Sequence, residues 1–158
     1  MVDFNSVLAK ASDQIEKPKA KPVGTYLAIV QGLPLQREVK PRDGGEDMGV
    51  IQFKLKLISP MSDVDMDQLS DHPPIPEWGP MNQDIFIHTE AGIYGLKKFL
   101  VNTLGVEPGE GKHVKTIGQM LAEAPGRQLL VKTKHVPYQD RQTGETDIAS
   151  NIESTAHV

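Results

Sequence analysis

The chain has 158 residues and a formal net charge of −4 at pH 7, a balance that does not indicate a globally basic binder of polyanions. It contains no cysteine, which excludes disulfide bonds, thiolate nucleophiles and most structural zinc sites. The N-terminus, MVDFNSVLAK, has no charged segment followed by an apolar stretch, and no apolar run reaches the length of a membrane span, so we expect neither a signal peptide nor contact with a membrane.

Residues 1–22 differ in pattern from the rest of the chain and form a separate N-terminal unit in our interpretation. Residues 3–16 carry apolar side chains at spacings of three and four, which predicts an amphipathic helix. Its apolar stripe consists of Phe4, Val7, Leu8, Ala11 and Ile15. Two interpretations of this stripe stay open: it packs on its own domain, or it docks on another subunit.

The end of this unit, KPKAKP, predicts a stiff and basic tether. Pro18 and Pro22 favour an extended backbone, because proline cannot continue a helix. The lysines between and before them keep the segment solvated; they are Lys17, Lys19 and Lys21. These lysines either stay in solvent or meet an acidic surface of a partner.

Residues 23–158 predict one β domain with helices. Apolar and polar residues alternate most clearly in VIQFKLKLI. Patterns of this kind predict strands at 24–33, 50–58, 83–89, 127–136 and 146–154. Thr89 and Gly105 are the expected boundaries of a helix, and a second short helix is expected over 116–124. A long loop, 59–82, contains five prolines, which forbid regular strand pairing over much of its length.

The predicted order is strand, strand, strand, helix, strand, strand. This is the order of the OB-fold, a five-stranded, partly open barrel that here has its helix between the third and fourth strands. An α+β sandwich with its helices on one sheet face would give the same order. We predict a mainly β, α+β domain and prefer the OB-like barrel, with the N-terminal helix as an extra element.

No motif in the sequence indicates catalysis. Asp63, Asp65 and Asp67 have the spacing of a calcium loop, but Gln68 and Pro74 stand where that loop needs glycine and glutamate. An acidic surface loop is therefore favoured over weak cation binding. The five histidines are scattered, and no serine lies in a nucleophile-elbow motif. We interpret the chain as non-enzymatic, with no cofactor and no metal site.

Basic and aromatic residues of the strands are candidates for a surface that binds single-stranded nucleic acid. Lysines occupy the polar faces of two predicted strands: Lys54, Lys56, Lys132 and Lys134. Phe86 is out of phase with its apolar neighbours and is the best outward-facing aromatic for stacking on a base. The alternatives are that the lysines form a solvated sheet face or that they protect a strand edge.

The segments LAKASDQIEKPKAKPVGTY and KHVPYQDRQTGE, with an OB-like body between them, resemble small accessory proteins of tailed bacteriophages. The resemblance covers most of the chain and rests on the Lys/Pro lead before Gly24, the Leu-rich helix that ends at Gly105, and the strand and turn around His135. It implies one of two functions, decoration or cementing of a capsid, or binding of single-stranded DNA in phage replication.

Our first expectation is a virion protein, assembled in the host cytoplasm, that binds a capsid protein or another virion subunit; self-association is left open. The residues expected at that contact are Phe4, Val7, Leu8, Ile15, Lys17, Lys19, Lys21 and Trp78. The alternative is a DNA-binding protein that uses the strand lysines and Phe86. The resemblance includes no diagnostic catalytic motif, so both expectations are binding functions.

Overall fold

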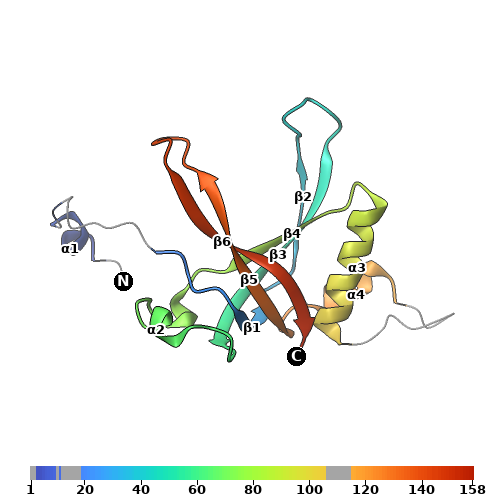
Figure 1. The fold of residues 1–158 in the computed structure, drawn as a ribbon. Coiled ribbons are helices and arrows are strands. Elements are labelled where there is room, and N and C mark those ends of the chain that lie inside the picture. Colours follow the sequence, from blue (N-terminus) through green and yellow to red (C-terminus); the bar gives the residue numbers. More distant parts are fainter. Residues whose placement is uncertain (1–2, 10, 12–18, 106–114) are drawn as a thin grey trace.

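The computed structural model describes residues 3–9, 11, 19–105 and 115–158 (Figure 1). Within these ranges the elements follow the order α1 (Phe4–Leu8), β1 (Thr25–Val30), β2 (Leu35–Val39), β3 (Met48–Pro60), α2 (Met66–Leu69), η2 (Ile75–Glu77), β4 (Met81–Phe86), α3 (Glu90–Leu104), α4 (Ile117–Glu123), β5 (Gln128–Gln139) and β6 (Thr146–His157). None of these helices combines the length and the apolar character that crossing a bilayer requires.

Strand β3 is the centre of the sheet, and three other strands pair with it. Residues 48–52 of β3 pair with β2, and residues 55–60 pair with β1. The opposite edge of β3 pairs with β4. Strand β5 pairs with the other edge of β1, and β6 pairs with β5, so the order is β2-β3-β1-β5-β6 with β4 beside β3. All of these pairs are antiparallel.

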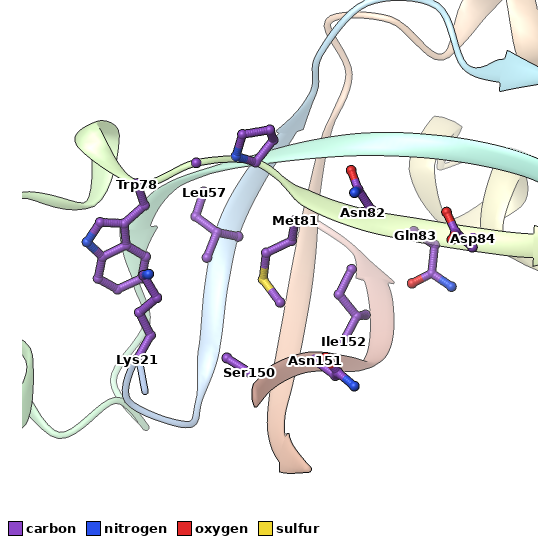
Figure 2. Close-up of a pocket in the computed structure, with 12 residues that line it drawn as sticks. Lys21, Leu57, Trp78, Met81, Asn82, Gln83, Asp84, Ser150, Asn151 and Ile152 are labelled. Carbon is purple, nitrogen blue, oxygen red and sulfur yellow. The ribbon is translucent and has the colours of Figure 1, made fainter. Parts of the chain in front are cut away.

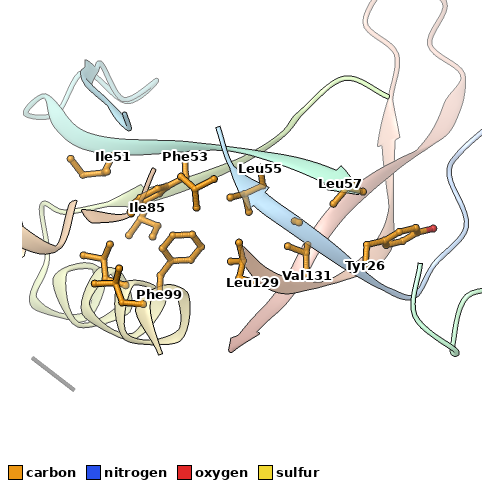
Figure 3. Close-up of a cluster of buried hydrophobic side chains, with 14 of the residues drawn as sticks. Tyr26, Ile51, Phe53, Leu55, Leu57, Ile85, Phe99, Leu129 and Val131 are labelled. Carbon is orange, nitrogen blue, oxygen red and sulfur yellow. The ribbon is translucent and has the colours of Figure 1, made fainter. Parts of the chain in front are cut away.

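The alternation of side chains along β3 separates the core from the surface. Phe53 and Leu55 have no exposed surface, whereas Lys54 between them points to solvent. Helix α3 covers the apolar face of the sheet with Phe99 and Leu100, and the rings of Phe53 and Phe99 have centroids 4.4 Å apart (Figure 3). Strands β1 and β5 contribute further buried side chains to the same cluster.

The two helices predicted after the third predicted strand are confirmed, together with their boundaries. The Thr89 side chain accepts a hydrogen bond from the Gly92 amide at the start of α3, and Gly105 ends this helix in the left-handed conformation with φ of 71°. Thr116 and Gln119 form a reciprocal capping box at the start of α4. These are local hydrogen bonds between residues close in sequence, which is why the sequence predicts them well.

The predicted α+β class with a mainly β body is confirmed, but the barrel with five strands is not what the structure has. The antiparallel sheet has six strands, and no strand pairing between β4 and β6 closes it within the described residues. The additional strand is β2, whose first four residues are all exposed. A strand with no buried side gives no alternation of apolar and polar residues, so periodicity does not reveal it.

The segment 59–82, predicted as a long loop, contains two short helices. Asp65 caps α2 by accepting hydrogen bonds from the amides of Asp67 and Gln68. After it, η2 carries Ile75 into the core, with Trp78 directly following. Pro60 is the last residue of β3 and pairs with Tyr26 of β1, whereas the other four prolines lie outside the strands. Between β3 and β4 the segment is held by buried side chains rather than left irregular.

Gly92, in the first turn of α3, has no room for a side chain, because a β carbon there would overlap the carbonyl oxygen of Phe86. Helix α3 therefore rests directly on the end of β4. We expect Gly92→Ala to lower the free energy of unfolding by about 1–3 kcal/mol, the usual cost of overpacking, in a chemical denaturation experiment.

Gly95→Ala is the matched control, since a β carbon at Gly95 meets nothing within 4 Å. This variant should be as stable as the parent chain or more stable by up to about 1 kcal/mol, because alanine favours helix over glycine. Equal stabilities of the two variants would contradict the close approach of α3 to β4.

Candidate functional site

Four lysines lie on the outward face of the sheet, and we call this set the lysine face. They are Lys54 and Lys56 of β3 and Lys132 and Lys134 of β5. Strand β1 lies between them: Lys56 is opposite Ile29, and Lys132 is opposite Thr25. Because opposite residues share a face and a strand rises about 3.3 Å per residue, the nearest members of the two pairs, Lys56 and Lys132, are offset by about 13 Å along β1.

Most of the charge on the lysine face is not neutralised. Lys132 has its ammonium nitrogen 3.7 Å from a carboxylate oxygen of Glu153, and both side chains are about half exposed. Within the described residues, Lys54, Lys56 and Lys134 take part in no ion pair. Three positive charges are thus available to an anionic ligand.

Phe86 lies on the same outward side of the neighbouring strand β4. Its side chain is 40% exposed, and its ring meets His88 edge-on with centroids 6.0 Å apart. Phe86 is opposite Val50, whereas Lys54 is opposite Asn82, so the ring lies four positions along β4 from the residue opposite Lys54. Asp84, which lies between Asn82 and Phe86 on this face of β4, forms an ion pair with Arg37. A guanidinium nitrogen of Arg37 lies 3.2 Å from a carboxylate oxygen of Asp84.

Strands β4 and β6 face one another at the open side of the sheet. Both run in the direction of β1, because an even number of antiparallel pairings separates each of them from it. In the described part of the chain no backbone hydrogen bond joins these two strands. Asn102 of α3 contacts this side of β6 by donating a hydrogen bond to the carbonyl oxygen of Thr155.

A cleft with a volume of about 680 Å³ opens between β4 and β6 (Figure 2). Apolar side chains from several elements line it: Leu57, Trp78, Met81 and Ile152. Polar groups line it as well, namely Lys21, Asn82, Gln83, Asp84, Ser150 and Asn151. The arrangement combines apolar surface with a high density of amide groups, which donate and accept hydrogen bonds without net charge.

One end of the cleft is built on a buried aromatic pair. Trp78 is 7% exposed; it meets the Tyr26 ring edge-on with centroids 5.7 Å apart, and its indole N–H donates to the carbonyl oxygen of Pro73. The Lys21 ammonium lies 5.4 Å from the centroid of the Trp78 ring. Trp78, expected at a partner contact, is therefore placed mainly in the core, with an edge on the cleft.

The last residues of the tether are fixed to the domain. The Tyr26 hydroxyl donates a 2.6 Å hydrogen bond to the carbonyl oxygen of Pro22. A ring nitrogen of His135 lies 2.7 Å from the carbonyl oxygen of Lys21. The chain is thus anchored at Lys21 and Pro22, two residues that our sequence interpretation assigned to a solvated lead.

The N-terminal helix is short and carries an exposed apolar surface. Phe4, Val7 and Leu8 are 70%, 53% and 80% exposed. Helix α1 packs against no other helix or strand in the described ranges. Lys19 is exposed, while Ile15 and Lys17 lie outside the described residues, as does most of the predicted helix beyond residue 9.

The acidic loop serves the fold. Both carboxylate oxygens of Asp63 accept hydrogen bonds from Thr25, one from its amide and one from its hydroxyl. These two hydrogen bonds hold the pKa of Asp63 below its usual value. With Asp65 occupied as a helix cap, no cluster of metal-ligating side chains is found in the part of the chain that the structure describes.

The sequence interpretation missed the polar residues of the cleft. Asn82, Gln83 and Asn151 lie on strands far apart in sequence and belong to no motif. The sequence pattern that could have revealed them is the run of polar residues at the beginning of β4, where Asn82, Gln83 and Asp84 are three of the first four residues. Only the pairing order of the sheet brings β4 and β6 together.

No protein-family model matches the chain, and no curated protein matches it. Among solved structures, the chain is similar to yeast RPA bound to ssDNA. The alignment has a TM-score of 0.35 and 6% sequence identity, and it covers 100% of this chain and 88% of that chain. At this level of similarity the comparison carries no argument about function.

Tyr26 provides a test of the buried end of the cleft. Burial, and to a smaller extent the charge of Asp63, raises the pKa of Tyr26 to about 12. The folded state therefore keeps the phenol protonated to a higher pH than the unfolded chain, where the pKa is about 10. The stability linked to this group is fully present below about pH 10 and is lost as the pH rises through about 12.

Urea denaturation between these pH values should show a fall of about 2–3 kcal/mol in the free energy of unfolding from this group. Tyr26→Phe should cost about 1 kcal/mol through the lost hydrogen bond to Pro22 and should remove this part of the pH dependence. Tyr94→Phe, which removes an exposed phenol, should retain it. Parallel pH profiles of Tyr26→Phe and the parent chain would rule out the buried, protonated phenol.

Proposed function

We propose that the chain is a non-enzymatic, OB-like protein that binds single-stranded DNA along its lysine face and across the neighbouring cleft. The observation that carries this proposal is the common orientation of the four lysines on two strands, three of them without an ion-pair partner in the described residues. The net charge of −4 makes this local concentration of positive charge the more distinctive.

The arrangement of the strands supports the OB-like part of the proposal. In an OB-fold, the face of strands 2 and 3 and the loops after strands 1 and 4 bind oligonucleotides. If β1 and β2 count as one interrupted strand, β3 and β4 are strands 2 and 3. The corresponding loops are 40–47 and 140–145, at the tips of two hairpins that project from the sheet (Figure 1). The cleft lies between the bases of these hairpins, on β4 and β6.

The chemistry of the two surfaces fits a single strand. Lysines attract the phosphate backbone without regard to sequence, and the resulting affinity falls steeply with salt. Exposed bases add stacking on an aromatic ring, for which Phe86 is available on the outward face of β4. The hairpin tips add no net positive charge, because Lys40, Arg42 and Arg141 are outnumbered there by Asp43, Glu46, Asp47, Asp140 and Glu145.

The experiment measures binding of a fluorescent oligo-dT of about 15 nucleotides, a length within the range of OB domains, at several salt concentrations. The logarithm of the association constant should fall linearly with the logarithm of salt, by about 0.7 per phosphate that is neutralised. Lys54→Gln with Lys56→Gln should weaken binding and reduce the slope by about 1.

Lys97→Gln with Lys115→Gln removes the same charge from α3 and from the start of α4 and should leave the slope nearly unchanged. The lysine face would be the wrong surface if both double variants reduced the slope equally. Absence of any salt-dependent complex with the parent chain would contradict DNA binding altogether.

A second candidate function, attachment to a virion subunit, is favoured by one specific observation. The apolar residues of α1 are more than half exposed and are covered by no other element in the described ranges. We propose in this case that Phe4, Val7 and Leu8 are buried on a capsid protein, with Ile15 and the tether lysines beside them. Each buried side chain would contribute about 1.5–3 kcal/mol to attachment.

The test uses virions or capsids of the encoding phage. The protein should be detected by mass spectrometry in purified particles, and Phe4→Ser with Leu8→Ser should abolish its cosedimentation with capsids, whereas Asn5→Ser should not. A deletion variant for this test should remove only residues 1–18. The carbonyl groups of Lys21 and Pro22 must stay, because they are hydrogen-bonded to His135 and Tyr26 of the domain. Absence of the protein from purified particles would exclude this function.

A further inference from the structure

The cleft between β4 and β6 has the features of a binding pocket rather than of a packing defect. Its volume of about 680 Å³ lies within the range of small-molecule sites. Leu57, Met81 and Ile152 provide apolar surface, while Asn82 and Asn151 carry exposed amide groups on either side. Figure 2 shows Met81 of β4 and Ile152 of β6 pointing toward one another across the cleft, with Asn82 on the opposite side of β4 from Met81.

The cleft adjoins the lysine face on both of its sides, and on the β6 side Asn151 is the register partner of Lys134. Asn82, which lines the cleft, is the register partner of Lys54 on the neighbouring strand. Cross-strand partners have β carbons about 5 Å apart and share a face of the sheet. An anionic group at Lys54 is therefore held one strand spacing from the entrance of the cleft.

We propose that the cleft accepts one base of the bound single strand, while the phosphate beside that base contacts Lys54. This inference rests on the proposed DNA-binding function and adds the chemical class recognised by the cleft. A nucleobase has a flat apolar surface and a polar edge with donors and acceptors. The cleft offers apolar side chains for the first and amide groups for the second.

Neutrality of the cleft argues for a base rather than a phosphate or a charged side chain. Its two charged side chains are of opposite sign, Lys21 and Asp84. Lys21 lies over the Trp78 ring, and Asp84 is paired with Arg37. The polar groups left to meet a ligand are the uncharged amides and the Ser150 hydroxyl, which suit hydrogen bonds to a base edge.

Trp78 gives this inference a direct signal. It is the one tryptophan of the chain, and it borders the cleft. A base that enters the cleft changes the surroundings of the indole and of the Lys21 ammonium above it, so the fluorescence of the protein should change with occupancy. Contact between DNA and the outer lysines alone leaves Trp78 untouched.

The experiment compares an oligo-dT of about 15 nucleotides with a fully abasic oligonucleotide of the same length, which keeps the phosphates and lacks the bases. Oligo-dT should change the Trp78 fluorescence to saturation, and the abasic chain should not. The abasic chain should also bind at least about 5-fold more weakly, because it loses the base in the cleft together with stacking on Phe86.

Variants separate the cleft from the lysine face. Asn82→Ala with Asn151→Ala, two exposed positions, should weaken binding of oligo-dT and leave binding of the abasic chain unchanged. Lys54→Gln should weaken both. Equal affinities for the two oligonucleotides, with no change in Trp78 fluorescence, would overturn the base pocket while leaving DNA binding intact. Failure of the parent chain to bind either oligonucleotide would overturn both proposals.

Discussion

The alternation of side chains along β3 is the constraint on which the rest of the structure depends. This strand of thirteen residues pairs with β2 and β1 on one edge and with β4 on the other. It therefore takes part in three of the five strand pairings of the sheet in the described residues. Every second side chain of its central part is buried in the core, where Phe53 meets Phe99 of α3, and the intervening lysines point outward. A shift of one residue in the register would bury lysines and expose Phe53 and Leu55, at a cost that no local interaction could offset.

The open side of the sheet follows from how its last strands are held. Strand β4 is short, with six residues, and the Phe86 carbonyl at its end is in contact with the first turn of α3. Strand β6 has twelve residues and pairs along nearly its whole length with β5. Because each strand is fixed by a different partner, the two face each other without a ladder in the described residues, and the cleft occupies the space that a ladder would fill. Unpaired strand edges usually invite other chains, and the amide-rich side chains at this edge make it a polar surface.

The sequence predicted local features well and long-range features poorly. Helix boundaries at Thr89, Gly105 and Thr116 depend on hydrogen bonds within a few residues, and the strand of Phe53 depends on a period of two. Strand β2 has no buried side and gives no such period. The lysine face was foreseen as two separate polar faces, but its assembly around β1 depends on register, which a single sequence does not encode. The cleft depends on the same register together with the position of α3, and none of its residues belongs to a recognisable motif.

The anchor at Lys21 and Pro22 determines how the two proposed surfaces relate. Hydrogen bonds to Tyr26 and His135 attach this point of the backbone to β1 and β5, beside the end of the cleft formed by Trp78. Everything before it reaches the domain through a segment rich in lysine and proline, whose composition favours extended and solvated backbone. The lysine face and the cleft therefore belong to the rigid sheet, whereas the apolar stripe of α1 does not depend on it. The two surfaces share no residue, so a partner bound to α1 does not occupy the lysine face through the same side chains. One chain can carry both contacts only if its tether is long enough to separate them, which makes the distance between Leu8 and Lys21 the quantity that decides whether the two functions compete.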